Sequence, residues 1–204
     1  ALLAGPHTQV RKAYTGRCNL HATVHGVLVV DVEAIIRTNR IDESITVGTL
    51  PPWSTVRKGQ VIATVKIIPL GVNPNVIESC QSVLATAPLH VAKLTAQRVA
   101  LIFSELPGLT ENAIAATRAA TRQRIEALGS RIALELRCPH TSSDIEFALR
   151  QAHAAGCELI MIRGAAGTKD RRDTAGAAIV AAGGRIERFG MPVEPGNMLL
   201  LGRL

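Results

Sequence analysis

Strand-like and helix-like segments alternate along the chain from Arg98 to its end. Three short apolar runs are typical of buried strands: RVALIF (98–103), RIALEL (131–136) and CELIMI (157–162). Helical patterns follow the first two of them, over residues 112–128 and 143–155. Such alternation builds βαβ units, whose parallel strands are covered by helices on both faces. The sequence therefore predicts an α/β fold, a three-layer sandwich with a mostly parallel sheet, for residues 98–204.

Capping residues indicate where these helices begin and end. Ser143 and Glu146 have the spacing of a capping box, in which the serine accepts from an amide three residues on and the glutamate reaches back. Gly129 and Gly156 are placed to end helices. A further helix is predicted over residues 174–184. The last strands are expected at RIERF (185–189) and MLLLG (198–202).

The first 95 residues have a different pattern. Short runs rich in Val, Ile and Thr are separated by Gly and Pro, which predicts a β-rich N-terminal module over residues 1–95. Two short helices are expected within it, at residues 32–39 and 76–86. Because the chain ends directly after a strand-like run, we expect the domain of residues 98–204 to be incomplete at its C-terminus.

The net charge of +7 raises the question of a nucleic-acid partner. The cations are spread, with 9 Lys and Arg against 5 acids in residues 1–97 and 14 against 11 in residues 98–204. The whole chain has five aromatic residues, too few for a platform on which bases stack. We therefore predict no nucleic-acid partner and a small anionic ligand instead.

Hydropathy and cysteine spacing indicate in which cellular compartment the protein acts. No apolar run reaches the roughly 18–20 residues of a membrane span, so no membrane partner is expected. The N-terminal residues lack the pattern of a signal peptide. The four cysteines, Cys18, Cys80, Cys138 and Cys157, lie far apart without paired spacing. A reduced, cytoplasmic location is the simplest interpretation.

The stretch RGAAGTKDRRDTAG (163–176) leaves the end of a predicted strand through a loop that is rich in glycine and in charge. Gly164 and Gly167 allow the backbone to approach a ligand. Asp173 stands directly before a helix, where its side chain is expected to cap the first free amides. Amides at a helix start form a cradle for anions. For Asp170, a surface ion pair with Arg171 or Arg172 is an equally simple interpretation.

GAAGTKDRRDTAGAAIVAAGG followed by RIERFGMPVEPGNMLLLG resembles the molybdopterin-binding domain of enzymes of molybdenum cofactor biosynthesis. In that family a strand ends in a glycine-rich loop, an aspartate precedes a helix, and a Pro-Gly turn follows. The turn here is Pro195-Gly196-Asn197. Ala165 and Ala166 replace a glycine and a threonine of the family's loop, and Asn197 stands where catalytic relatives commonly have lysine. The resemblance covers residues 98–204.

The resemblance implies a molybdopterin-binding protein that acts in cofactor maturation, by adenylylating the pterin phosphate or inserting molybdate if it is an enzyme. It makes Asp173 the candidate catalytic residue. The implied binding residues are Gly164, Gly167, Thr168, Asp170, Arg171, Arg172, Asp173, Pro195, Gly196 and Asn197. Lys169 is a further cation beside the ligand's phosphate. Mg²⁺ and ATP are further candidate ligands.

The partners implied are molybdopterin or its adenylylated form and other cofactor-biosynthesis proteins, with the chain acting as a homo-oligomer. Two alternatives stay open: a non-catalytic carrier or sensor of the finished cofactor, and a general nucleotide-binding α/β domain.

Two other motifs are weaker. Cys18, His21 and His25 have spacing that could suit zinc, but no fourth ligand is evident, and alternation along a strand sends the side chains to different faces. We predict no metal site. Cys138 and His140 could form a nucleophile and base, but neighbours in sequence seldom make such a pair.

Overall fold

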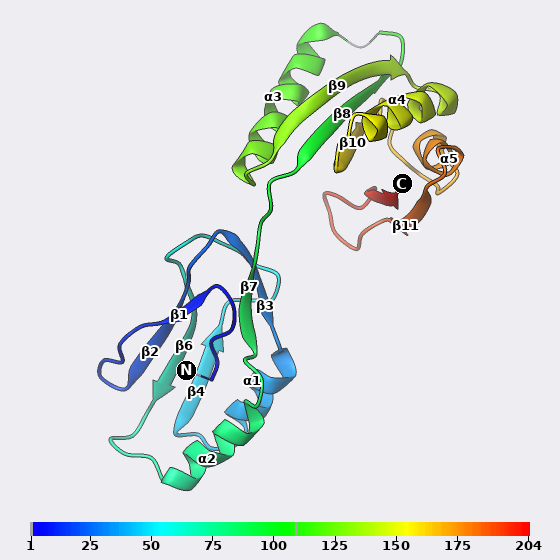
Figure 1. Cartoon of the computed structure of the whole chain (residues 1–204). Coiled ribbons are helices and arrows are strands. Elements are labelled where there is room, and N and C mark those ends of the chain that lie inside the picture. Colours follow the sequence, from blue (N-terminus) through cyan, green and yellow to red (C-terminus); the bar gives the residue numbers. More distant parts are fainter. Residues whose placement is uncertain (1, 109) are drawn as a thin grey trace. The chain divides into compact units, whose positions relative to one another are not determined.

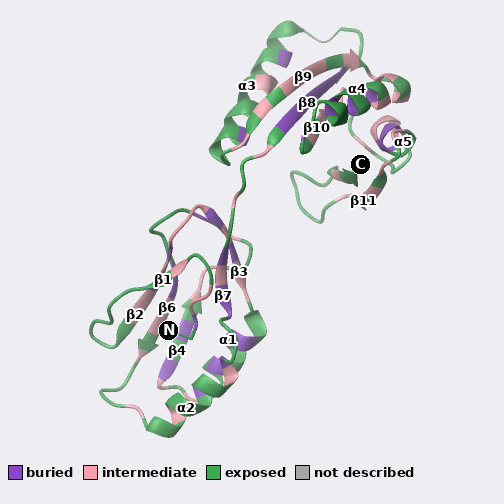
Figure 2. Cartoon of the chain, viewed as in Figure 1, coloured by how far each residue is buried: buried purple, intermediate pink, exposed green. Residues whose placement is uncertain are grey.

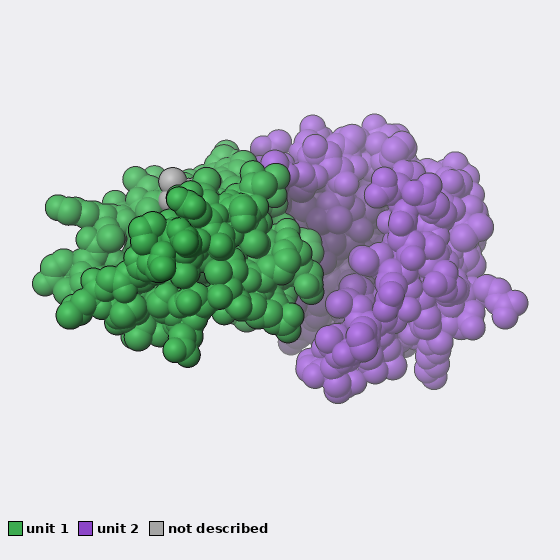
Figure 3. All heavy atoms as spheres, turned by 90° about the horizontal axis from the view of Figure 1, so that it is seen from below, with its two compact units in different colours: residues 1–94 green, residues 95–204 purple. Residues whose placement is uncertain are grey.

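The computed structural model describes residues 2–108 and 110–204. The chain divides into two compact units, Ala1–Leu94 and Thr95–Leu204 (Figure 1; Figure 3 colours them separately). Each unit contains hydrophobic clusters of its own.

Unit 1, residues 1–94, is built mainly from two antiparallel sheets. One sheet has the order β1-β2-β6-β4 and the other β5-β3-β7. The strands are β1 Thr8–Val10, β2 Arg17–Ala22, β3 Gly26–Val30, β4 Ile45–Thr49, β5 Thr55–Val56, β6 Val61–Ile67 and β7 Leu89–Lys93. Leu20 and Ala63 from the first sheet pack in one cluster with Leu28 and Val91 from the second. The core of unit 1 therefore lies between the two sheets.

Two helices complete unit 1, as the sequence predicts. Helix α1 spans Val32–Asn39, the predicted range, and begins where Asp31 accepts a hydrogen bond from the Ala34 amide. Helix α2 spans Pro74–Val83. It begins two residues before the prediction because Asn73 caps it and proline suits the first turn.

Unit 2, residues 95–204, contains a three-stranded parallel sheet of order β10-β8-β9, so the predicted α/β class is confirmed. The strands are β8 Arg98–Glu105, β9 Arg131–Pro139 and β10 Leu159–Arg163. Helix α3 (Glu111–Ala127) connects β8 to β9, and helix α4 (Ser142–Ala154) connects β9 to β10. Parallel neighbours need long crossovers of this kind.

The central strand β8 is buried on both faces. Leu101 and Phe103 pack with Ile114 of α3, while Ile102 packs with Ile145 of α4. Successive side chains of a strand point to opposite faces, so α3 and α4 lie against opposite faces of the sheet. Figure 2 shows β8 as a buried strand beside helices that are exposed on their outer sides. Among the helices within the described residues, none is long and apolar enough to cross a membrane.

The last two strands form a separate two-stranded sheet. Helix α5 (Thr174–Ala181) leads to β11 (Arg185–Phe189), which pairs antiparallel with β12 (Leu200–Arg203). The strands are thus found close to where the sequence predicts them, but they do not extend the parallel sheet. The connection between them holds only residues 190–199, which suits a hairpin and is too short for a parallel crossover.

The start of α4 differs from the sequence prediction. Thr141 is the capping residue: its hydroxyl accepts from the Asp144 amide at 3.2 Å and lies 2.5 Å from the Asp144 carboxylate. Glu146 instead pairs with Arg150, one turn further on, at 2.9 Å. Several hydroxyl residues lie in a row here, and the backbone turns into the helix one position before Ser143. The predicted capping box of Ser143 and Glu146 is therefore wrong.

Candidate functional site

A cavity of about 220 Å³ lies at the carboxyl ends of β8 and β10, beside the first turns of α3. Its polar lining comes from Ser104, Glu105, Thr117, Arg163 and Gly164. The carboxyl ends of parallel strands are where open α/β sheets bind ligands. The cavity therefore has the position and the mixed polarity of a ligand site.

Ser104 and His140 lie at this end of the sheet and contact each other. The Ser104 hydroxyl is 2.8 Å from His140 Nδ1, and Ser104 is only 2% exposed. The His140 amide donates to the Glu105 carbonyl at 2.9 Å. A Cβ atom built on Gly164 would lie 3.7 Å from His140 Cε1. The imidazole is therefore held by the ends of β8 and β9, next to the start of the glycine-rich loop.

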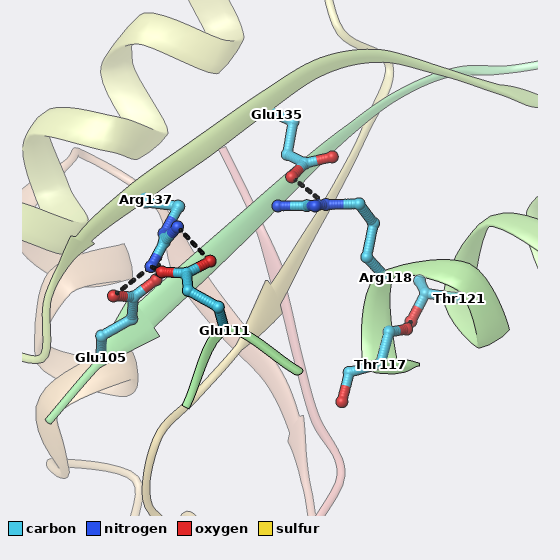
Figure 4. Close-up of polar contacts among 7 residues, drawn as sticks. All are labelled: Glu105, Glu111, Thr117, Arg118, Thr121, Glu135 and Arg137. Carbon is cyan, nitrogen blue, oxygen red and sulfur yellow. Dashed lines mark hydrogen bonds and ion pairs between the residues drawn. The ribbon is translucent and has the colours of Figure 1, made fainter. Parts of the chain in front are cut away.

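Arg137 connects two carboxylates at the same end of the sheet (Figure 4). Its guanidinium donates to Glu105 at 3.0 Å and to Glu111 at 2.7 Å. The hydrogen bond from Arg137 lowers the pKa of Glu111, and the two carboxylates, Glu105 first, raise the pKa of Arg137. Glu111 is largely exposed and Arg137 partly so, which means that solvent screens these pairs and they contribute little to stability. Their effect is to fix Glu105 beside the cavity.

A second ion pair lies further along the α3 face of the sheet. Arg118 and Glu135 are 2.5 Å apart (Figure 4). The Arg118 guanidinium also lies 5.9 Å from the centre of the Phe103 ring. The Thr117 hydroxyl donates to the Ala113 carbonyl within α3 at 2.9 Å. Its oxygen can still accept from a ligand, because a hydroxyl has two lone pairs.

Asp173 organises the predicted loop, but not as the sequence suggests. Asp173 does precede α5, yet its side chain makes no capping hydrogen bond. Its Oδ2 instead accepts from the Lys169 amide at 2.5 Å and from the Asp170 amide at 3.0 Å. The predicted cap is therefore wrong, because the carboxylate turns back into the loop. Through these two hydrogen bonds, Asp173 holds residues 169–173 in a tight turn.

The charged residues of the loop lie at the surface. Asp170 accepts from the Arg172 amide at 2.7 Å, and the two side chains are 3.6 Å apart, so the simple surface pairing is observed. The Arg172 side chain is 94% exposed, and Arg171 is exposed as well. Both cations are therefore accessible to a ligand.

The loop folds closely over the first turn of α5. A Cβ atom on Gly176 would lie 1.9 Å from the Arg171 carbonyl oxygen, so only glycine fits there. The Arg171 carbonyl oxygen therefore lies against the first turn of α5, where the sequence predicts free amides that bind an anion. Gly164 and Ala165, at the start of the loop, line the 220 Å³ cavity, whereas the residues that line it include none from α5.

The remaining predicted residues lie further from the 220 Å³ cavity. A Cβ on Gly167 would lie 2.9 Å from Met198 Sδ, and Thr168 and Met198 both line a larger cavity of about 740 Å³ beside β10, α4, α5 and β12. The exposed turn Pro195–Asn197 directly precedes Met198. Gly164 thus lies at the smaller cavity, and Gly167 and Thr168 lie near the hairpin turn.

Sequence reasoning missed the residues that come from other strand ends. Ser104, Glu105, His140 and Arg163 were not predicted as a group, since they lie up to 59 residues apart (163 minus 104). The signal that could have found them is positional. Each stands at or just after the end of a predicted parallel strand, and these ends meet at one edge of the sheet.

Two residues of the possible zinc motif, Cys18 and His21, form ordinary hydrogen bonds to backbone carbonyl groups. Cys18 Sγ is 3.2 Å from the Arg11 carbonyl, and His21 Nδ1 is 2.8 Å from the Gly59 carbonyl. In the described part of the chain, no group of three or more His, Cys, Asp or Glu side chains is arranged to hold a metal ion.

Cys138 provides a first prediction, on reactivity. Burial, and then the nearby Asp144 and Glu105 carboxylates, raise the pKa of the Cys138 thiol above its ordinary value of 9.0. The thiol is therefore protonated near neutral pH, and we expect its alkylation by iodoacetamide to reach half its maximal rate only above pH 9.0. Peptide mass spectrometry against pH measures this, with the urea-unfolded chain as control. Fast alkylation of folded Cys138 at neutral pH would show a reactive thiolate and contradict the prediction.

The chain was also compared with known proteins. No protein-family model, no curated protein and no solved structure matches it.

Proposed function

We propose that unit 2 binds molybdopterin, or its adenylylated form, during maturation of the molybdenum cofactor. The observation that supports this best is the cavity of mixed polarity at the carboxyl ends of β8 and β10, with the glycine-rich loop at its edge. The order of strand, glycine-rich loop, aspartate, helix and Pro-Gly turn is the order in which the sequence resembles the molybdopterin-binding family.

The donors and acceptors around the cavity match the chemistry of this ligand. Molybdopterin carries a terminal phosphate and a polar pterin. Arg163 and the amides that follow Gly164 can donate to phosphate, with Lys169, Arg171 and Arg172 on the same loop. The Glu105 carboxylate can accept from pterin N–H groups. The cavity of about 220 Å³ suits one end of such a ligand, since pockets that hold a whole small-molecule ligand usually measure roughly 300 Å³ or more.

In this proposal Asp173 is a positioning residue. By holding the Lys169 and Asp170 amides, it sets the course of the loop that receives the ligand. Its second oxygen, Oδ1, is available to a pterin N–H group or to Mg²⁺ beside a phosphate.

The reaction class follows from the ligand. If the chain is an enzyme, it adenylylates the pterin phosphate with Mg²⁺ and ATP, or inserts molybdate. His140, held by Ser104 at the same end of the sheet, is then the candidate side chain for moving a proton. A non-catalytic carrier or sensor is the alternative, favoured by Asn197 in place of the family's lysine. A general nucleotide-binding domain is the third.

The finer architecture and the setting belong to the same proposal. With α3 and α4 on opposite faces of the sheet, we infer the three-layer sandwich of the family for unit 2. Its partners are then other cofactor-biosynthesis proteins, and the chain is expected to act in the cytoplasm as a homo-oligomer.

The test is a titration of the full chain with molybdopterin, followed by pterin fluorescence in the absence of oxygen. We expect Asp173→Ala to lose about tenfold or more in affinity, because two loop amides lose their charged acceptor. Lys66→Ala, in unit 1, should bind as the unaltered chain does. If Asp173→Ala and Lys66→Ala bound molybdopterin with equal affinity, the binding site would not lie at the loop that Asp173 holds.

Two further variants separate the contributions to binding. Asp173→Asn keeps a side-chain oxygen that can accept from the loop amides. This variant should therefore retain binding if the role of Asp173 is only to hold the loop. Replacing Arg171 and Arg172 by Gln should weaken phosphate-bearing ligands far more than dephosphorylated pterin, because charged donors strengthen phosphate bonds. Binding of ATP without any binding of molybdopterin would favour the nucleotide-binding alternative.

A further inference from the structure

Charges of the two signs are separated in unit 1. Residues 1–30 and 44–77 contain no Asp or Glu, but they contain six cations: Arg11, Lys12, Arg17, Arg57, Lys58 and Lys66. All five acids of unit 1 lie within residues 31–43 or at Glu78. Counted over residues 1–97 as a whole, the cations are accompanied by acids, and on that count no nucleic-acid partner is expected. Within unit 1, however, these six cations and the five acids lie in different segments of the chain.

The cations gather around the outer face of the sheet β1-β2-β6-β4. On its inner face Leu20, Ala63 and Val47 are buried in the core. Alternation along the strands therefore turns Arg17 and Lys66 outward, and these two are direct cross-strand partners. Like charges in this position repel each other unless an anion neutralises them.

Polar side chains occupy the outward positions next to these cations. Asn19 accepts from Arg17 Nε at 3.2 Å and from the Thr64 hydroxyl at 2.9 Å, which fixes Arg17 against the sheet. Thr46 on β4 is the partner of Lys66, and Gly48 that of Thr64. None of these positions holds an aromatic or a large apolar side chain, which the centre of a protein–protein interface usually requires.

The two ends of the face carry the other cations. Arg11 and Lys12 belong to the turn between β1 and β2, next to Arg17. At the opposite end the turn with Arg57 and Lys58 lies against the sheet through the contact of His21 with the Gly59 carbonyl. No cation of unit 1 takes part in an ion pair among the residues that the structure describes.

We propose that this face binds the phosphodiester backbone of a nucleic acid, without reading its sequence. Clustered Arg and Lys with hydroxyl and amide donors between them are the groups that contact phosphates. Tyr14, which bridges to Arg17 in the β1–β2 turn and is 80% exposed, offers one ring and not a platform for successive bases, so the contact is mainly electrostatic. With at most six cations, binding is salt-sensitive and strongest at low ionic strength.

The test measures fluorescence anisotropy of a labelled single strand of about 20 nucleotides with the full chain, from about 50 to 200 mM salt. We expect Arg17→Gln with Lys66→Gln to weaken binding about tenfold at the lowest salt and to reduce the slope of log K against log salt by about 1.4. The matched control is Arg37→Gln with Arg40→Gln, which removes the same charge from exposed positions at the end of α1.

The control variant should bind within about twofold of the unaltered chain and keep its salt slope. Equal weakening in both variants would show that only net charge matters and would overturn the proposal. Absence of binding at low salt, or a loss confined to Arg171→Gln with Arg172→Gln in unit 2, would overturn it as well. Circular dichroism confirms that each variant is folded before its binding is compared.

Discussion

Ile102→Ala is expected to lower the free energy of unfolding of unit 2 by about 2–5 kcal/mol. Ile102 lies on the central strand of the parallel sheet, is fully buried, and packs with Ile145 and Leu149 of α4. Its truncation removes apolar contacts and leaves a cavity between sheet and helix. Hydrogen exchange followed by mass spectrometry measures the change, since its peptides report on each unit separately.

The control for this prediction is Val180→Ala. Val180 is 57% exposed on α5, so its truncation should change the stability of unit 2 by less than about 0.5 kcal/mol. The peptides of unit 1 should exchange alike in both variants, because Ile102 belongs to no cluster of that unit. Equal destabilisation by the two substitutions would show that the sheet and α4 are not packed as described.

Gly176→Ala is expected to destabilise unit 2 by about 1–3 kcal/mol and to displace the candidate ligand loop. The new Cβ would lie 1.9 Å from the Arg171 carbonyl oxygen. This oxygen belongs to the backbone, so the loop itself must move, and the hydrogen bonds from the Lys169 and Asp170 amides to Asp173 are lost with it. Faster hydrogen exchange at residues 169–173 is the measured outcome.

Gly167→Ala is the matched substitution in the same loop. There the new Cβ would meet Met198 Sδ at 2.9 Å, the end of a flexible side chain that can turn aside. Its effect on stability and on loop exchange should therefore be smaller than that of Gly176→Ala. If the order were reversed, the close packing of the loop on α5 would not be the feature that shapes it.

Many elements of both units could be predicted from the sequence, because their causes are local. The apolar runs at β8 and β9 and the range of α1 follow from side-chain periodicity and from capping residues within a few positions. The α/β class follows as well, since alternating strands and helices leave few arrangements other than a parallel sheet.

Details that depend on a choice between near-equal local partners were not predictable. Thr141 rather than Ser143 caps α4, and Asp173 accepts from the loop rather than from α5. In each case several hydrogen bonds of similar strength compete. The path of the backbone, which is set by packing elsewhere, decides between them.

The sequence by itself determined the strands of the parallel sheet, most helix positions and the glycine-rich loop, because each depends on residues that are neighbours along the chain. Only the tertiary structure decided which side chains share a site: Ser104 with His140, Glu105 with Arg137, and Arg17 with Lys66. These pairs are brought together by strand register and by crossover helices. Register depends on burial of whole sheet faces, a long-range property that no short stretch of sequence contains.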